Sequence, residues 1–421
     1  MNVLDLIAAV LTLTALLAYV NARFMHLPTV IGVMVLGMAF SLILVLFDKN
    51  GFDFAAQTER LIGHIDFRAT LLDGMLSFLL FAGALQVKSG GLREHYGIVA
   101  TLATVGVVFS TVIVGVLSWW LARWVGVELP YRFALLFGAL ISPTDPIAVL
   151  AILRKAGIDD ETELKITAES LFNDGVGIVI FLLVFAFASS GKDVTVAQGL
   201  VLFAREAIGG VVFGTAAGGV AYLMLRTIDN YQAEVLITLA LVTGGYALAH
   251  ALGVSGPIAM VVAGLLIGNQ GRAFAMSETT RQHIDLFWEV IDEVLNAVLF
   301  LLIGLEVLLV SFKSSWLLLG AGAVVIVLIA RLASISLPIL VSDWQRRAFR
   351  RNTIPILTWG GLRGGISVAL ALYIPAGNQR DIVLTMTYVV VVFSILVQGL
   401  SIGPMVRRFV QRSAVVDMDN G

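Results

Sequence analysis

Two carboxylates and an amide stand at the start of an apolar segment, where charged groups are not expected. The run 169–175 reads Glu-Ser-Leu-Phe-Asn-Asp-Gly and opens the apolar stretch 176–187. On a helix, residues four apart share a face, which pairs Ser170 with Asp174 and Glu169 with Asn173 on adjoining faces. Ionisable groups at membrane depth are costly, and by default they mark an ion path or a proton relay. The alternative is a helix start at the membrane surface, with the carboxylates near the positive end of the helix dipole.

Composition places this run in a membrane protein. The chain has 421 residues, of which 59% are hydrophobic and 13% charged, against about 25% charged in soluble domains. Without cysteine it has no disulfide, thiolate metal site or cysteine nucleophile, and its five histidines lack metal-ligand spacing. No catalytic His/Ser or His/metal grouping appears, so we expect no enzyme activity and no cofactor. The net charge of −2 indicates no partner, and no nucleic acid is expected.

The chain is predicted to be an all-α polytopic membrane protein. A membrane span needs about 20 apolar residues, and the sequence contains thirteen candidates: 3–22, 28–47, 69–87, 98–120, 133–153, 166–187, 199–225, 235–252, 257–269, 290–310, 316–340, 354–374 and 382–409. No segment outside them is long enough for a soluble domain. We therefore expect one integral-membrane domain over 1–412 and a short cytoplasmic tail at 413–421.

Lysine and arginine counts predict the orientation in the membrane, because these residues are enriched in cytoplasmic loops. With the N-terminus outside, inner loops and span ends hold sixteen of them and outer ones nine. The inner side then includes the basic block 346–351. An odd number of spans places the C-terminus in the cytoplasm.

The fifth candidate span is interrupted by Ser142-Pro143-Thr144-Asp145-Pro146. Two prolines three residues apart remove backbone donors and clash with the preceding turn, which predicts two half-helices joined by an unwound segment. Thr144 or Asp145 is a good N-cap, and Pro146 suits the first turn of the second half. The freed carbonyls can bind a cation, and Asp145 can neutralise the positive helix end. The alternative is a proline-kinked structural helix.

The twelfth candidate span carries a similar weak point, four glycines around Arg363 in the stretch 360–365. The two interrupted spans are seven apart, and an odd offset reverses direction across the membrane. This spacing suggests an inverted-topology repeat, and paired interruptions point to a transporter's binding site. The alternative is that the glycines serve only tight helix packing.

The two arginines inside spans must be balanced by buried acids. Arg331 lies in the middle of the eleventh candidate span, and Arg363 is the other. If Arg331 pairs with Glu169, Asp174 is left without a permanent counter-ion. An unpaired carboxylate in a low-dielectric site binds either a proton or a cation, which is the minimum chemistry for exchange. Neutral oxygens of the kind that hard cations prefer come from Asn173, Ser170 and Thr144.

Other acids in the apolar segments give weaker indications. Glu289, Asp292 and Glu293 precede the apolar core of the tenth candidate span, and we expect them to line a vestibule or the membrane interface. Glu306 stands near the outer end of the same span and is interpreted as a structural partner.

The motifs Glu169–Gly175, Thr144-Asp145-Pro146 and Gly361–Gly365 together resemble those of the bacterial NhaP-like sodium/proton antiporters, of the monovalent cation/proton antiporter superfamily. The resemblance covers about positions 1–410. It implies two crossed broken helices, around 142–146 and 360–365, in a moving core domain that takes parts of 69–187 and 290–409. The remaining helices would form a dimerisation domain, giving a homodimer in the cell inner (plasma) membrane.

The resemblance also implies roles for single residues. Asp174 would be alternately protonated and cation-loaded, and Asn173 would replace the second aspartate of electrogenic relatives. Thr144 and Ser170 resemble ion ligands or near-ligands. Glu169 resembles the acid that pairs with an arginine of the eleventh helix, which is Arg331 here. Arg363 resembles the arginine of the second broken helix. The chain departs from many relatives at Ala82, where they carry an acid.

The expected function is therefore exchange of a monovalent cation, Na⁺ in preference to Li⁺ or K⁺, for H⁺ by electroneutral alternating access. One alternative is a K⁺/H⁺ or electrogenic antiporter, but its usual second aspartate is Asn173 here. A cation channel is the other alternative, and single-channel current would distinguish it from exchange.

Overall fold

The computed structural model describes residues 3–48, 74–87, 97–158, 160–189, 196–308, 313–341 and 353–408. Within these ranges every regular element is a helix and none is a strand. This agrees with the predicted all-α class. Positions 69–73, the basic block 346–351 and the predicted tail 413–421 lie outside the described residues.

The described part of the first half of the chain forms seven α-helices and two short π-helical turns. Their bounds are α1 (Val3–Val20), η1 (Asn21–Met25), α2 (Thr29–Asp48), α4 (Leu76–Gln86), η3 (Leu102–Gly106), α6 (Val107–Val125), α7 (Tyr131–Ile141), α8 (Ile147–Ala156) and α9 (Asp160–Ser189). The fifth predicted span is thus divided between α7 and α8, with residues 142–146 outside both helices.

The second half continues with helices of similar length. These are α10 (Val196–Thr227), α11 (Tyr231–Ala251), α12 (Gly256–Leu266), η4 (Ile267–Gly271), α13 (Arg272–Phe274), α14 (Glu278–Leu305), η5 (Glu306–Leu308), α15 (Ser314–Val341), α17 (Thr353–Gly360), α18 (Gly365–Tyr373), α19 (Asn378–Phe393) and η6 (Ser394–Gly399). All thirteen predicted spans therefore contain helix.

Length and composition alone support a smaller number of complete spans. Among the described residues, seven helices are long and apolar enough to cross a membrane, or eight if the bent pair α17 and α18 counts as one span. The chain is thus a protein with several membrane-crossing helices, while the count of thirteen and the orientation remain predictions.

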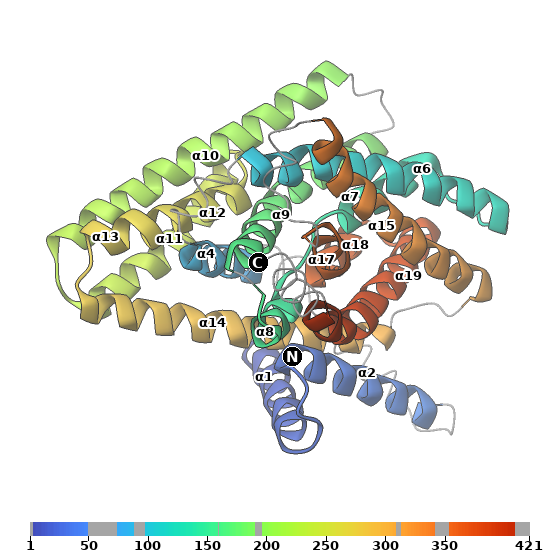
Figure 1. Cartoon of the computed structure of the whole chain (residues 1–421), viewed down its shortest axis with the longest axis horizontal. Coiled ribbons are helices and arrows are strands. Elements are labelled where there is room, and N and C mark those ends of the chain that lie inside the picture. The colour runs from blue at the N-terminus through green and yellow to red at the C-terminus, as the bar shows by residue number, and fades with distance from the viewer. Residues whose placement is uncertain are drawn as a thin grey trace, which may run out of the picture.

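The helices gather into two groups that meet at the centre of the molecule. Figure 1 shows α10–α14 and α4 on one side, and α6, α7, α15 and α17–α19 on the other, with α8 and α9 between them. A separate hydrophobic cluster joins α4 to α10–α14, and it includes Phe81 and Trp288, whose ring centroids are 4.8 Å apart. The larger cluster holds the other group together with α1 and α2.

Close approach between helices depends on small residues. A Cβ atom added at Gly138 of α7 would lie 2.3 Å from the backbone oxygen of Thr111 on α6, so these two helices touch through their backbones. Such small-residue contacts are typical of helices packed in a bilayer, where no hydrophobic effect drives them together. They fix α7 and hence the position of the interruption that follows it.

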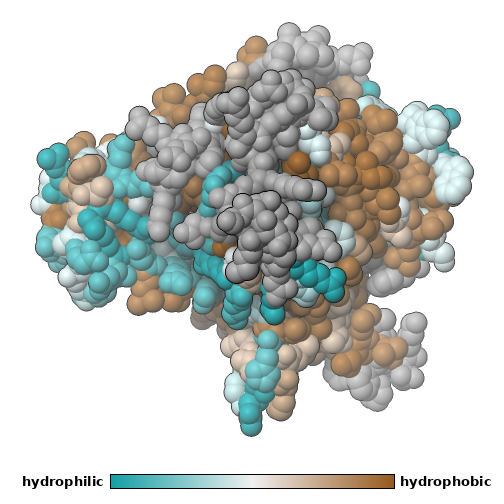
Figure 2. Space-filling view, in the orientation of Figure 1, coloured by the Kyte–Doolittle hydropathy of each residue, from teal (hydrophilic) through white to brown (hydrophobic). Residues whose placement is uncertain are grey.

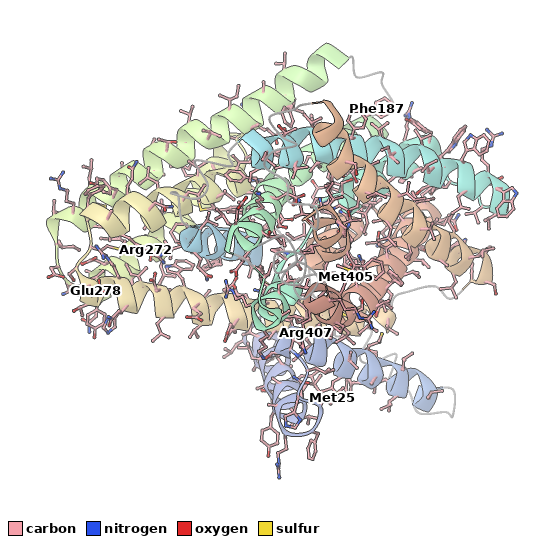
Figure 3. The ribbon with its side chains drawn as sticks, viewed as in Figure 1. Met25, Phe187, Arg272, Glu278, Met405 and Arg407 are labelled. Atoms are coloured by element: carbon pink, nitrogen blue, oxygen red, sulfur yellow. The ribbon has the colours of Figure 1, made fainter. Side chains whose placement is uncertain are left out.

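The surface is apolar along the outer faces of the helices and polar at one end. Large side chains such as Val112, Val212 and Trp124 are exposed, as expected for a lipid-facing surface. Figure 2 shows apolar residues over the region of α6 and α15, and hydrophilic residues at the opposite end. That polar end contains Arg272, which pairs with Asp285, and Glu278 at the start of α14 (Figure 3).

Candidate ion-binding site

In the structure neither Thr144 nor Asp145 occupies the N-cap position of α8. Pro146 occupies the N-cap position of α8 and makes no capping hydrogen bond. The prediction that Thr144 or Asp145 caps this helix is therefore wrong. The reason is that the Thr144 hydroxyl is bonded elsewhere, and the Asp145 N–H donates to the carbonyl of Leu362, 2.8 Å away. Residues 142–146 thus pack against the second interruption.

The second interruption separates α17 from α18, which are bent by 50° relative to each other. The Arg363 N–H donates to the hydroxyl of Ser394, 2.9 Å away. A Cβ atom added at Gly364 would lie 2.0 Å from Oδ2 of Asp145. Only glycine allows the carboxylate of Asp145 to approach the backbone this closely.

Arg363 connects the two interruptions through its guanidinium. Its Nη1 donates to the carbonyl oxygen of Ser142 and, at 2.8 Å, to that of Pro143. These carbonyls follow the C-terminal end of α7, where the helix dipole is negative and a cation is favoured. Two of the carbonyls freed by the prolines are therefore occupied by the protein's own cation, and they are not available to a transported ion in this structure.

Glu169 is buried and paired, which rules out its interpretation as a surface group. Its Oε2 accepts from Nη2 of Arg331 at 2.8 Å, and its Oε1 accepts from Nη1. The side chain of Glu169 is 1% exposed, and Nε of Arg331 also donates to the carbonyl of Leu357 at 3.3 Å. This parallel two-bond geometry is the strong form of an Arg–carboxylate pair.

Asn173 and Thr144 bond to each other reciprocally and so join α9 to the first interruption. Nδ2 of Asn173 donates to Oγ1 of Thr144 at 2.8 Å, and the Thr144 N–H donates to Oδ1 of Asn173 at 3.2 Å. The hydroxyls of Thr144 and Ser170 are 3.0 Å apart. All three side chains are buried. Along α9, Asn173 directly precedes Asp174, and Ser170 lies four residues, about one helical turn, before it.

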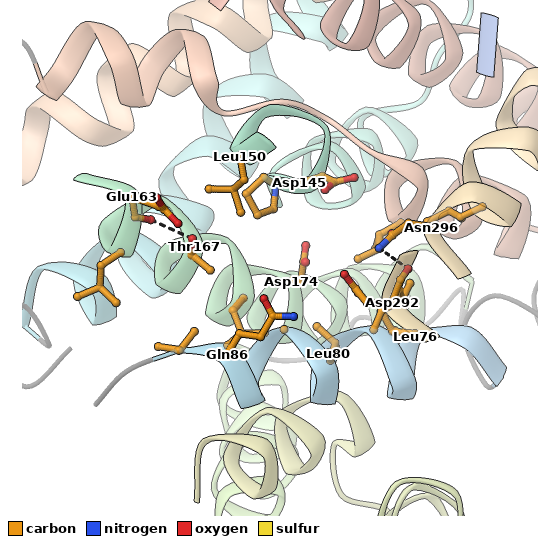
Figure 4. A pocket seen from close by; sticks show the side chains of 18 of the residues that line it. Leu76, Leu80, Gln86, Asp145, Leu150, Glu163, Thr167, Asp174, Asp292 and Asn296 are labelled. Atoms are coloured by element: carbon orange, nitrogen blue, oxygen red, sulfur yellow. Dashed lines mark hydrogen bonds between the residues drawn. The ribbon is translucent and has the colours of Figure 1, made fainter. Parts of the chain in front are cut away.

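Asp174 differs from these neighbours because it has no partner. It is 9% exposed, and it forms no hydrogen bond or ion pair with any described residue. Its carboxylate lines a cavity of about 620 Å³, together with Asp145. Figure 4 shows both side chains beside this space. A buried carboxylate that faces a cavity without a partner among the described residues is arranged to bind a small cation or a proton.

The cavity lies between the two helix groups. Its walls come from α4, α8, α9 and α14, and its polar lining comprises Gln86, Asp145, Arg154, Glu161, Glu163, Thr167, Asp174, Asp292 and Asn296. No set of three or more His, Asp or Glu residues in the described ranges is close enough to chelate a metal ion.

Several cavity residues were not singled out from the sequence. Gln86 and Asn296 lie in apolar helices without any accompanying motif, so only the fold brings them to the cavity. Of the three acids expected to line a vestibule, Asp292 lines the cavity, whereas Glu289 and Glu293 do not belong to its lining. Ala82, where many relatives are expected to carry an acid, is fully buried in the α4–α14 cluster.

These features, two interrupted helices joined by an arginine and an unpaired aspartate facing a cavity, are those of an ion transporter. Residues 11–408 match the transmembrane sodium/hydrogen exchanger family. The chain belongs to this family and is a multi-pass membrane protein.

Individual relatives cover nearly the whole chain. It is 51% identical to the Na⁺/H⁺ antiporter NhaP of Pseudomonas aeruginosa, over 96% of each sequence. It is 32% identical to the Na⁺/H⁺ antiporter NhaH of Halobacillus dabanensis, over 92% of this chain and 93% of NhaH. Among solved structures, the sodium proton antiporter MjNhaP1 of Methanocaldococcus jannaschii matches with a TM-score of 0.74 at 20% identity, over 97% of this chain and 99% of that one. The fold is thus that of an antiporter of this family.

Proposed function

We propose that this protein exchanges Na⁺ for H⁺ across the plasma membrane by alternating access, with Asp174 binding the two ions in turn. The observation that carries the proposal is the contrast along α9. Glu169 is neutralised by Arg331, whereas Asp174 faces the cavity without a counter-ion among the described residues. The names of the relatives, sodium/proton antiporters, support the same activity.

Exchange follows from competition at one carboxylate. Asp174 is neutral when it carries a proton and again when it holds a monovalent cation, so both loaded forms bury little net charge. The empty and ionised form is the costly one to move through an apolar region, and this cost couples the two ions. Because Asn173 is an amide, we propose that one proton is exchanged for one Na⁺ and that the cycle is electroneutral.

The neighbours of Asp174 supply position and oxygen atoms. Thr144, Ser170 and Asn173 form one hydrogen-bonded group, and we propose that their oxygens are ligands or near-ligands of the cation. Asp145 faces the same cavity. It adds negative charge that favours a cation over a neutral solute.

Glu169, Arg331 and Arg363 are proposed to be structural. Arg331 satisfies Glu169, and Arg363 compensates the dipole at the end of α7. With their charges balanced inside the protein, these groups hold the two broken helices in a crossed arrangement without taking part in ion binding.

Movement between the helix groups would expose Asp174 to each side in turn. We propose a core of α6–α9 and α15–α19 that moves against α1, α2, α4 and α10–α14, the second group forming a homodimer. This division differs from the sequence-based one, which counted 69–87 with the core, because Phe81, Ala82 and Leu85 of α4 pack in the cluster of α10–α14, while other residues of α4 contact the larger cluster. Arg154 and Glu163 line the cavity and lie on the side predicted to be cytoplasmic, so we propose that the cavity opens to the inside.

The test is sodium-driven proton flux in proteoliposomes. Asp174→Asn is expected to fold and to exchange nothing, because an amide neither titrates nor balances a cation. Glu278→Gln is the matched control, since Glu278 is exposed at the start of α14 and, among the described residues, pairs only with Arg281. If Asp174→Asn supports proton flux at the wild-type rate, the proposal is wrong. An imposed voltage distinguishes electroneutral from electrogenic exchange, and single-channel current would indicate a channel.

A further inference from the structure

We infer that Asp292 on α14 recruits the incoming cation from the cavity wall opposite Asp174, and that the adjoining amide of Asn296 forms part of the same polar patch. This inference rests on the proposed sodium/proton exchange. It assigns a positioning role to a residue of the helix group that does not carry Asp174.

The geometry places two carboxylates on facing walls. Asp174 belongs to α9, whereas Asp292 and Asn296 lie on α14 and line the same cavity. Figure 4 shows Asp174 and Asp292 directed into one space, with Asp145 from the interrupted helix beside them. Apolar residues such as Leu80 form much of the remaining wall. Low-dielectric walls around charges of one sign focus the field into the cavity and raise the local cation concentration.

The charges near the mouth of the cavity do not contribute to this field, because they are balanced. Glu163 accepts from Arg154 at 2.8 Å, and Glu161 accepts from Lys165 at 2.6 Å. Asp292 has no ion pair with any residue in the part of the chain that the structure describes. The uncompensated negative charge of the cavity therefore includes Asp292 as well as the proposed ion-binding carboxylate.

Asn296 supplies a second observation that points to a ligand. Its side chain is 1% exposed, and its Nδ2 donates to the backbone carbonyl of Asp292 at 2.8 Å. Its Oδ1 is buried and accepts no hydrogen bond within the described residues. An unsatisfied buried amide oxygen is costly unless a donor or a cation reaches it. A carboxylate and an amide oxygen on one wall are the ligand types that hard cations prefer.

Two neighbouring acids of α14 differ from Asp292 because they do not face the cavity. Glu289 and Glu293 are exposed and do not belong to the cavity lining. Asp174 lies on α9, in the proposed moving core, whereas Asp292 lies on α14, in the other helix group. Asp292 is therefore expected to face Asp174 only while the cavity is open as in this structure. The effect of Asp292 on Na⁺ binding should then appear at one membrane face and not at the other.

The experiment measures the KM for Na⁺ at each membrane face, in inside-out and right-side-out vesicles. Asp292→Asn is expected to raise the KM at the cavity face roughly three- to tenfold at low ionic strength, with Vmax changed by less than about twofold. The KM at the opposite face should stay at the wild-type value. Impermeant salt such as choline chloride should reduce the difference, because it screens the field of Asp292. Glu293→Gln, one residue further along α14, is the matched control and should match wild type.

Two further variants separate recruitment of the cation from a structural role. Asp292→Glu keeps the charge and should restore most of the affinity for Na⁺. Asn296→Ala should raise the KM at the same face by a smaller factor, and it provides a second test if Asp292→Asn does not fold. An unchanged KM in Asp292→Asn, or an equal change at both faces, would overturn the inference. In either case wild-type exchange would still support the proposed function, whereas absence of exchange in wild type would refute that function itself.

Discussion

Arg331 of α15 donates to both carboxylate oxygens of Glu169, which lies on the same helix, α9, as Asp174. Glu169 and Asp174 are five residues apart, so one stretch of α9 contains an acid with a fixed counter-ion and an acid without one among the described residues. The fixed pair keeps the net charge of the interior low. Asp174 is then the acid whose charge must be balanced by a proton or by Na⁺.

Breaking this pair from either side should strongly destabilise the protein. Glu169→Gln or Arg331→Met leaves one buried charge without compensation, which costs about 3–5 kcal/mol. The double variant Glu169→Gln/Arg331→Met removes both charges, and its loss of stability should be smaller than the sum of the losses of the two single variants. Thermal unfolding in detergent measures all four proteins. Strict additivity of the losses would show that the two side chains do not act as a pair.

Asn173→Asp should weaken the link between α9 and the first interruption. A carboxylate can still accept from the Thr144 N–H, but it cannot donate to Oγ1 of Thr144 as the amide does. The loss of one buried hydrogen bond is expected to cost about 1–3 kcal/mol. The new acid also stands beside Asp174, so the remaining flux should become sensitive to imposed voltage as a second proton joins the cycle.

The matched control for this change is Asn230→Asp. Asn230 caps α11 by accepting from the N–H groups of Gln232 and Ala233, and aspartate caps a helix equally well. Stability and flux should therefore match wild type. An Asn173→Asp protein with wild-type stability and voltage-insensitive flux would contradict the role assigned to the amide.

Several parts of the site could be predicted because each depends on a residue type that is unfavourable inside an apolar helical span. An arginine in the middle of an apolar span requires an acid, and Arg331 does contact Glu169. Two prolines or several glycines in a span interrupt a helix, and the helices do end at Ile141 and Gly360. In each case the physical cost is local and can be recognised without knowing the neighbours.

Other parts could not be predicted because they depend on which helices are neighbours. The partners of Arg363 are backbone carbonyls, which look alike at every position of the sequence. The cavity wall from α14 and the burial of Ala82 depend on which helices pack against each other. The helix α4, which contains Ala82, is apolar on nearly all sides and so lacks the polar and apolar faces that indicate which side meets which neighbour.

Gly364→Ala should abolish exchange by displacing Asp145. The added Cβ would lie 2.0 Å from Oδ2 and 2.5 Å from Cβ of Asp145, so the carboxylate or the interrupted backbone must move. Gly219→Ala is the control, because a Cβ at Gly219 meets nothing within 4 Å and alanine favours a helix. Sodium-driven flux should be lost in the first variant and retained in the second. Equal flux in both would show that the contact of Gly364 with Asp145 is not needed for transport.

Glu306 is a buried acid that, unlike Glu169, has no hydrogen-bond partner among the described residues, and it does not line the cavity. Its side chain is fully buried, and neither carboxylate oxygen forms a hydrogen bond with a described residue. The expected role as a structural ion-pair partner therefore has no contact to support it in the structure. Because glutamine has the same shape and cannot ionise, Glu306→Gln should leave stability within about 1 kcal/mol of wild type or raise it. Thermal unfolding and flux of Glu306→Gln and Glu169→Gln, measured together, give the comparison. If Glu306→Gln folds normally but stops exchange, Glu306 titrates during transport, and the one-carboxylate cycle proposed for Asp174 is incomplete.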